Sequence, residues 1–258
     1  ISRLARAHAS NQRSIANAGG VKLLVDLLDV DAGGVNAAVL SGPAAVAALA
    51  NAKLQKKIAS AIWSMAFENT ENQMAIANAG GIPPLIALLE GHPEVHKDVA
   101  GAIWALASNK DNQRTISKEG GIAPLVELLK NGSRDAQETA AGALHALAET
   151  ADNRVSIAKA GGIPLLVALF DGGSQQATEQ AAGALRTLAH ANPANQLSIA
   201  NELVAMLKNG SPQAQEHVTE LLRNLAQDPE NRTAIAKAGA VPELVRQLEM
   251  GSEKAMGM

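Results

Sequence analysis

Apolar residues along this chain recur with helical spacing, and residues 72–110 show the pattern most clearly. A short stripe consists of Leu85, Leu88 and Leu89, which fall on one side of a helix. A longer stripe consists of Val95, Val99, Ala102, Ile103 and Leu106. The pattern predicts two successive helices, and neither has an apolar face that it could bury alone.

Residues typical of turns predict where the helices of this segment begin and end. We expect Asn72 to cap a short first helix and Gly80-Gly81 to end it, because glycine adopts the left-handed cap conformation without penalty. Two prolines at 83–84 are expected to open the second helix, where the missing N–H would be unpaired in any case. Pro93 is expected to start a third, longer helix. The segment is therefore predicted to hold three helices.

This three-helix unit recurs with a period near forty residues, which is typical of a helical solenoid. Its copies begin at Asn11, Asn72, Asn112, Asn153, Asn195 and Asn231. The expected fold is all-α. The expected divisions are the end of a truncated unit (1–10), a unit with an insertion at about 31–50 (11–71), regular units (72–111, 112–152 and 153–194), a shortened unit (195–230) and a truncated unit (231–258).

Two units depart from the pattern. The insertion at about 31–50 is too apolar for a disordered linker, so we expect one or two short helices, broken at Gly42-Pro43, with the third helix resuming near Lys53. It is either a tolerated surface insertion or a lid or docking element. The unit from Asn195 lacks five residues, including the glycine pair, so its first helix is expected to be vestigial or merged with the second.

The register at both ends predicts a fragment of a longer array. Residues 1–5 align with 185–189, in the middle of a third helix. Residues 251–256 resemble the beginning of a third helix that does not finish. Neither end shows the polar outer face that a terminal solenoid repeat needs.

The repeated motifs resemble those of the armadillo repeat. The resemblance lies in Asn-Gln at the start of the unit, Ala-Gly-Gly-Ile-Pro-Pro-Leu at 79–85 and Ala-Ala-Gly-Ala-Leu at 140–144 and 181–185. It implies a right-handed α-solenoid with three helices per repeat, whose third helices line a concave groove. It also implies binding of an extended peptide or a partner domain in that groove, without saying which one.

Helical register places a row of side chains along the expected groove. The row consists of Ser2, Trp63, Trp104, His145, Arg186 and Arg223. Seven residues earlier on the same face are Lys56, Lys97, Glu138, Glu179 and Glu216. The import adaptors of the family carry Trp at the positions of Gly101 and Gly142 and Asn four residues later, and only Asn224 matches. The chain therefore does not resemble a standard nuclear-import adaptor.

Trp63 and Trp104 are the only tryptophans, and we expect them to stand side by side with Gly101 leaving space between them. Exposed tryptophan is a typical binding anchor. The alternative is that residues 31–50 or neighbouring sequence cover both rings. The charges on the same face either orient a bound peptide or are merely solvated.

Composition narrows the classes of function. With 22 basic and 25 acidic residues the net charge is −3, so no overall field favours nucleic acid. The chain has no cysteine, which excludes disulfides and thiolate catalysis. No apolar run approaches the length of a membrane span. His92 and His96 are not expected to share a helical face, and the glycine-rich segment 171–174 lacks the lysine of a phosphate loop.

We therefore predict a non-enzymatic protein-binding scaffold, with no cofactor and no metal, in the cytoplasm, with the nucleus and the cilium as alternatives. Its partner is expected to be a protein or peptide. Two alternatives are a structural subunit that uses its convex face and the substrate-recruiting arm of a larger enzyme such as a ubiquitin ligase.

Overall fold

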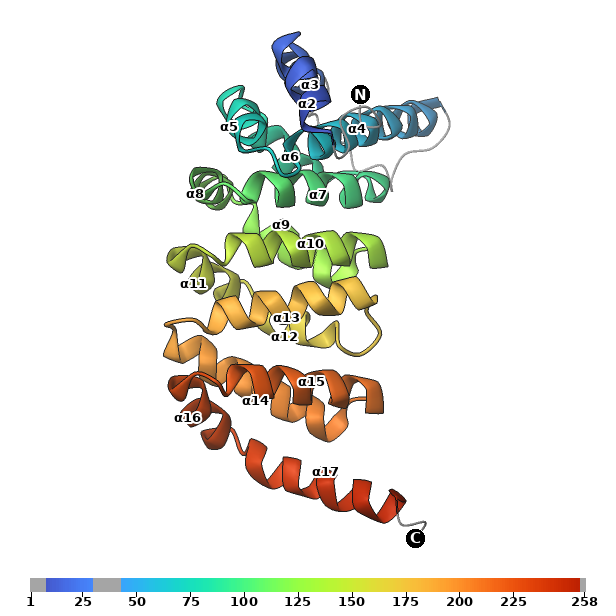
Figure 1. Cartoon of the computed structure of the whole chain (residues 1–258). Coiled ribbons are helices and arrows are strands. Elements are labelled where there is room, and N and C mark those ends of the chain that lie inside the picture. Colours follow the sequence, from blue (N-terminus) through green and yellow to red (C-terminus); the bar gives the residue numbers. More distant parts are fainter. Residues whose placement is uncertain (1–7, 30–42, 256–258) are drawn as a thin grey trace.

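The computed structural model describes residues 8–29 and 43–255, and this part of the chain is a stack of helices (Figure 1). It contains sixteen α-helices, one 3-10 helix and no strand. Figure 1 shows the helices following one another along a single long column, from α2 and α3 at one end to α17 at the other. The prediction of an all-α solenoid is confirmed.

The helices fall into three sets according to their place in the repeat. The first helices are α2 (Ala9–Asn17), α5 (Thr70–Asn78), α8 (Lys110–Lys118), α11 (Ala151–Lys159) and α16 (Pro229–Lys237). The second helices are α3 (Gly20–Asp29), α6 (Ile82–Leu88), α9 (Ile122–Asn131), α12 (Gly162–Ala168) and α17 (Ala240–Ala255). The third helices are α4 (Pro43–Ala66), α7 (His96–Ala107, after the 3-10 helix η2, Pro93–Val95), α10 (Arg134–Leu147), α13 (Gln175–Ala189) and α15 (Pro212–Leu225). The remaining helix is α14 (Pro193–Asn209).

The turn between first and second helices is built as the glycine pairs predict. Gly80 has a φ of +82°, in the left-handed region that glycine adopts readily. The next glycine, Gly81, has an ordinary helical φ of −73°, and the two prolines at 83–84 occupy the first turn of α6. Gly120 and Gly161 repeat the left-handed turn, with φ values of +82° and +81°.

The prediction that Asn72 caps the first helix is wrong by three residues. Helix α5 begins at Thr70, and its cap is Asn69, whose side chain accepts a hydrogen bond from the backbone N–H of Asn72 at 3.0 Å. Asn72 itself is buried, and its Nδ2 donates to the carbonyl of Met65 at 2.9 Å. The repeated asparagine therefore fastens the first helix to the end of the preceding third helix.

In later units the same asparagine also reaches the neighbouring repeat. Asn112 Nδ2 lies 3.1 Å from the carbonyls of both Leu106 and Gln73. Asn195 makes the equivalent pair of bonds, to Leu188 at 3.0 Å and Arg154 at 3.2 Å. Since buried carbonyls without a donor are costly, these asparagines hold successive repeats in register.

The core runs along the column between the three sets of helices. All five members of the predicted longer stripe are fully buried, namely Val95, Val99, Ala102, Ile103 and Leu106. The stripe of the second helix is also buried. These predictions are confirmed, whereas the exact residue boundaries of the repeats stay a prediction.

Two helices are longer than expected. Helix α4 is continuous from Pro43 to Ala66, so the expected restart of the third helix near Lys53 is wrong. Residues 30–42, which include most of the predicted insertion, lie outside the described part. Helix α17 likewise continues to Ala255 without ending at Gly251, so the expected start of a separate helix there is also wrong.

The shortened unit is built around one merged helix. Helix α14 runs unbroken from Pro193 to Asn209, in place of a first and a second helix, as the missing glycine pair predicted. Past this merged helix the third helices are stacked less closely. Helices α4, α7, α10 and α13 pack closely in succession, whereas α15 barely touches α13.

A candidate binding face on the third helices

The predicted row of side chains lies along one face formed by α4, α7, α10, α13 and α15, which are stacked in this order in Figure 1. We call this the third-helix face. Trp63, Trp104 and His145 are partly exposed there, and Arg186 and Arg223 are exposed. Ser2 lies outside the described residues.

The ring of Trp63 covers a glycine of the next third helix. A Cβ atom placed on Gly101 would lie 2.4–2.6 Å from Cε3, Cδ2 and Cζ3 of the indole. Near-equal distances to three adjacent ring atoms mean that the face of the ring, and not its edge, lies over the glycine. Gly101 therefore makes room for the indole of Trp63 itself, which lies directly over the glycine, rather than for open space at its own position.

The same arrangement repeats along the face. Trp104 covers Gly142, where a Cβ would lie 2.6 Å from Cδ2, and His145 covers Gly183, where it would lie 2.5 Å from Cε1. The series ends at α15, where the equivalent residue is Glu220 instead of glycine. Each ring is thus supported from beneath by the following repeat, and its other side is left toward solvent.

The two tryptophans line one hollow of about 400 Å³. We call it the tryptophan hollow, and its walls are Trp63, Phe67, Glu68, Thr70, Gln73, Trp104, Ala105 and Ser108. Phe67 is 46% exposed, although it is a large apolar residue. The expected row of groove residues did not include Phe67. A usable signal was its contrast with Ser108, the equivalent residue of the next repeat.

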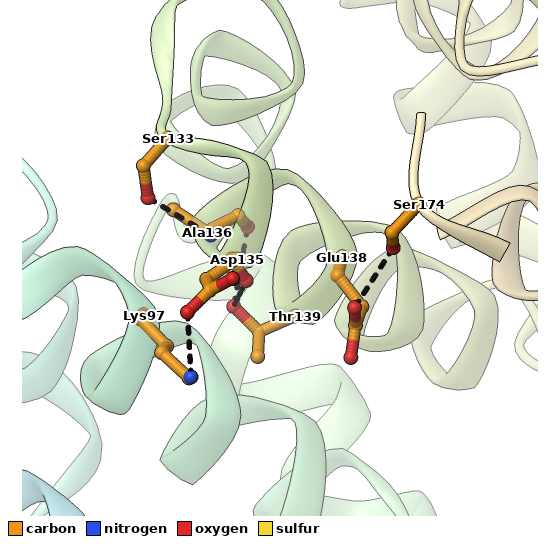
Figure 2. A network of polar contacts seen from close by, with 7 residues as sticks. All are labelled: Lys97, Ser133, Asp135, Ala136, Glu138, Thr139 and Ser174. Carbon is orange, nitrogen blue, oxygen red and sulfur yellow. Dashed lines mark hydrogen bonds and ion pairs between the residues drawn. The ribbon is translucent and has the colours of Figure 1, made fainter. Parts of the chain in front are cut away.

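Two of the charged residues predicted on this face, Lys97 and Glu138, are bonded to the next repeat. Figure 2 shows Lys97 of α7 reaching Asp135 of α10, with Nζ 2.7 Å from Oδ2. It also shows Glu138 of α10 accepting a hydrogen bond at 2.9 Å from the hydroxyl of Ser174, the cap of α13. These two contacts join successive third helices. They leave less of the charge of Lys97 and Glu138 available to attract a partner.

The Lys97–Asp135 pair shifts the pKa of both groups. The hydrogen bond from Lys97 lowers the pKa of the Asp135 carboxyl, and the same bond raises the pKa of the Lys97 ammonium. Both side chains are about half exposed, at 48% and 63%. Water therefore screens the pair, and its contribution to stability is small.

Helices α13 and α15 enclose a second hollow, of about 580 Å³. We call it the α13–α15 cleft. It brings together three of the predicted site residues, Glu179 and Arg186 from α13 and Asn224 from α15. His217 and Glu220 of α15 line it as well. The cleft lies where the series of rings and glycines ends and α15 separates from α13.

The other predicted residues are placed separately. Lys56 is exposed on α4, and Arg223 lines a further hollow at the α15 end of the stack. His145 Nδ1 lies 3.2 Å from Oε1 of Gln180, so this ring is tied to α13. Thus the structure brings Trp63 and Trp104 together, and separately Glu179, Arg186 and Asn224, but not all ten residues.

The described residues include neither a cluster of potential metal ligands nor a helix that could span a membrane. It holds no group of three or more His, Asp or Glu side chains that could bind a metal. His92 and His96 make separate local contacts, to the N–H of Glu94 and the carbonyl of Gly91. No helix there is both long and apolar enough to cross a bilayer.

Comparisons with known proteins agree on the fold. The family model "Armadillo/beta-catenin-like repeat" matches residues 69–108, 109–148 and 150–190. A comparison with curated protein sequences gives no match. An engineered protein solved by the Northeast Structural Genomics Consortium is 30% identical with a TM-score of 0.74. The match covers 95% of this chain, and the chain spans 57% of that protein.

Designed armadillo repeat proteins are also similar in structure. One, described as computationally designed for modular peptide recognition, is 22% identical with a TM-score of 0.67, over 86% of this chain and 89% of that one. Another, solved in complex with the peptide (KR)4, is 23% identical with a TM-score of 0.67, over 86% and 88%. With its repeated three-helix units and these matches, the chain belongs to the armadillo repeat family.

Proposed function

We propose that this protein is a non-enzymatic binding scaffold that holds an extended segment of a partner protein across its third-helix face. The observation that carries the proposal is the placement of Trp63 and Trp104. Both are partly exposed, both line the same hollow, and each rests on a glycine of the next repeat. Rigid, half-exposed tryptophans are the side chains most enriched among binding hot spots.

The spacing of the two hollows suits an extended peptide. Neighbouring third helices lie about 10 Å apart, and the tryptophan hollow lies three helix spacings from the α13–α15 cleft. An extended chain advances about 3.3 Å per residue, so about nine residues would connect the two hollows. In the cleft, the side-chain amide of Asn224 offers both a donor and an acceptor for a peptide main chain.

The family supports a peptide as the occupant. A designed armadillo repeat protein has been solved with the peptide (KR)4 bound. The shared fold shows that an armadillo stack can hold a peptide. The chemistry of the peptide for this chain follows from its own side chains.

A second candidate, a structural subunit that uses the first helices, has one observation in its favour. Met74 of α5, Val155 of α11 and Leu197 of α14 hold equivalent positions and are 49%, 42% and 42% exposed. The charged side chain of Arg114 occupies the same position on α8, between Met74 and Val155. Since isolated exposed apolar residues are common on protein surfaces, we favour the third-helix face.

Selection from a random peptide library tests the proposal. Peptides selected on the wild-type protein should be lost on a Trp63→Ala/Trp104→Ala variant and kept on a Met74→Ser/Val155→Ser/Leu197→Ser variant. Circular dichroism confirms that each variant is folded. A further variant, Trp63→His/Trp104→His, keeps a ring over Gly101 and Gly142, as His145 does over Gly183, and so controls for the loss of packing on the glycines. The opposite result, with peptides lost only on the first-helix variant, would favour the structural subunit.

A further inference from the structure

The aromatic residues of this chain are concentrated in one place. The chain has two tryptophans, two phenylalanines and no tyrosine, and three of these four side chains line the tryptophan hollow. They are Trp63, Phe67 and Trp104. None of the three belongs to the buried core itself, although Trp63 and Trp104 pack against it while remaining partly exposed. Their convergence on a surface hollow points to a ligand.

Phe67 is the most informative of the three. In the following repeats its equivalents are Ser108, Glu149, His190 and Gln227, all polar and exposed. Phe67 is also on the surface, at 46% exposure, so packing does not explain an aromatic ring there. A ring that the fold does not require is best explained by what the hollow binds.

The three rings are arranged around open space. Phe67 directly follows the last residue of α4, and its backbone N–H donates to the carbonyl of Trp63 at 3.0 Å. The helical turn therefore continues, and the two side chains are neighbours on one side of the chain. Trp104 faces them from α7. Within the described part the one close ring pair is Phe170 with His217, so these three rings do not stack on one another. A space of about 400 Å³ remains between them.

The hollow carries a single charge, and that charge is negative. Among the described residues that line it, Glu68 is the one charged side chain, and it forms no ion pair within the described part. Aromatic faces attract cations through their ring electrons, and several rings with a carboxylate suit an alkylated ammonium group. A bare lysine ammonium is strongly hydrated and loses more on entering such a site.

We propose that the tryptophan hollow binds an alkylated ammonium group, presented as a methylated lysine of the bound peptide. The rings enclose the methyl groups, and Glu68 balances the charge. The peptide in this inference rests on the proposed function, whereas binding of the ammonium group itself does not.

The two tryptophans make the test selective, because every indole N–H signal of the protein comes from this hollow. We would titrate the full chain with trimethyllysine capped by acetyl and methylamide groups and follow both signals by NMR. The comparison ligands are capped lysine and the uncharged analogue with tert-butyl in place of trimethylammonium. Trimethyllysine should shift both signals and bind about tenfold more tightly than either comparison ligand.

Two variants of the hollow complete the test. Phe67→Ser introduces the residue of the next repeat, and Glu68→Gln removes the charge. Both should weaken binding of trimethyllysine several-fold, whereas Glu68→Gln should leave the uncharged analogue unaffected. Val155→Ser, on α11, is the matched control and should change nothing.

Three results would overturn the inference. They are equal affinity for trimethyllysine and its uncharged analogue, no shift of either indole signal, and trimethyllysine binding that survives both variants of the hollow. None of these results decides the outcome of the peptide selection, because peptides can still bind through Trp63 and Trp104. Conversely, if peptide selection fails while trimethyllysine binds, the proposed function falls and the subsite remains.

Discussion

The indole of Trp63 lies face down on Gly101, so one repeat supplies the ring and the next supplies the surface beneath it. Trp104 and Gly142 repeat the relationship. A side chain at either glycine would occupy the space of the ring. The glycines therefore allow close packing of successive third helices and at the same time hold flat rings toward solvent.

Replacing Gly101 with alanine should displace the ring of Trp63. The new Cβ would lie 2.4 Å from Cε3, far inside contact distance. We expect the free energy of unfolding to fall by about 1–3 kcal/mol, as for other overpacked sites. Tryptophan emission should move to longer wavelength as the ring enters water. Chemical denaturation followed by fluorescence and circular dichroism measures both effects.

In the control for this prediction, Gly101→Ala should change the stability in the opposite direction. In a Trp63→Ala background no ring covers Gly101, so alanine there should stabilise the helix by about 0.5–1 kcal/mol through its better helix propensity. A Gly101→Ala change that destabilises both backgrounds equally would show that the ring is not the cause.

Asn112 should contribute more to stability than Asn109, the cap of the same helix. It donates at 3.1 Å to two buried carbonyls, of Leu106 and Gln73. Asn112→Ala leaves both without that donor and should cost about 2–3 kcal/mol in the free energy of unfolding. Asn109→Ala, which removes only the cap of α8, should cost about 1 kcal/mol. Equal costs for the two variants in urea denaturation would contradict the assigned role of Asn112.

How far the sequence predicts this structure differs between local and cross-repeat features. Glycine and proline act within one turn of the chain. The left-handed turn at Gly80, with a φ of +82°, and the start of α6 at its prolines were therefore predictable. The merging of α14 followed from five missing residues. The role of Asn72 was misjudged, because a cap and a buried donor both favour asparagine at the start of a helix. The partners of Lys97 and Trp63 lie in the next repeat, and no local rule places them.

The length of α4 was missed for a similar reason. Gly42-Pro43 predicts a break inside the insertion, whereas Pro43 opens a helix that continues without interruption to Ala66. Proline is compatible with both, because it is favoured in the first helical turn and disfavoured only further inside.

The Lys97–Asp135 pair should make a small, pH-dependent contribution to stability. The lowered pKa of Asp135 means that its contribution is present above the ordinary carboxyl pKa and is lost as the pH falls through the lowered value. The raised pKa of Lys97 means that its contribution is present below the ordinary lysine pKa and is lost as the pH rises through the raised value. Because both groups are about half exposed, the effect should be at most about 1 kcal/mol and should shrink in salt.

Lys97→Met tests this assignment. Urea denaturation at acidic and neutral pH, at low and high salt, should show that the variant has lost part of the acid-sensitive stability. If the wild type and the variant lose equal stability between the two pH values, the pair does not shift the pKa of Asp135.

The column should unfold less cooperatively beyond α13. Helix α15 barely touches α13, whereas α4, α7, α10 and α13 pack closely, and a solenoid unfolds where coupling between repeats is weak. Both tryptophans lie in α4 and α7, so fluorescence reports the other end of the column. Circular dichroism should therefore detect a transition at lower denaturant than fluorescence does. Coincident transitions would show that coupling across the α13–α15 cleft is as strong as elsewhere.

The central claim, that a partner occupies the third-helix face, can be tested by cysteine footprinting, because the chain has no cysteine of its own. Single Ser60→Cys and Ser108→Cys variants place thiols on that face, and Ser117→Cys and Ser156→Cys place them on the first helices α8 and α11. Alkylation rates would be compared with and without a selected peptide. We predict that the peptide slows alkylation at positions 60 and 108 and leaves 117 and 156 unchanged. Protection confined to positions 117 and 156 would contradict the account.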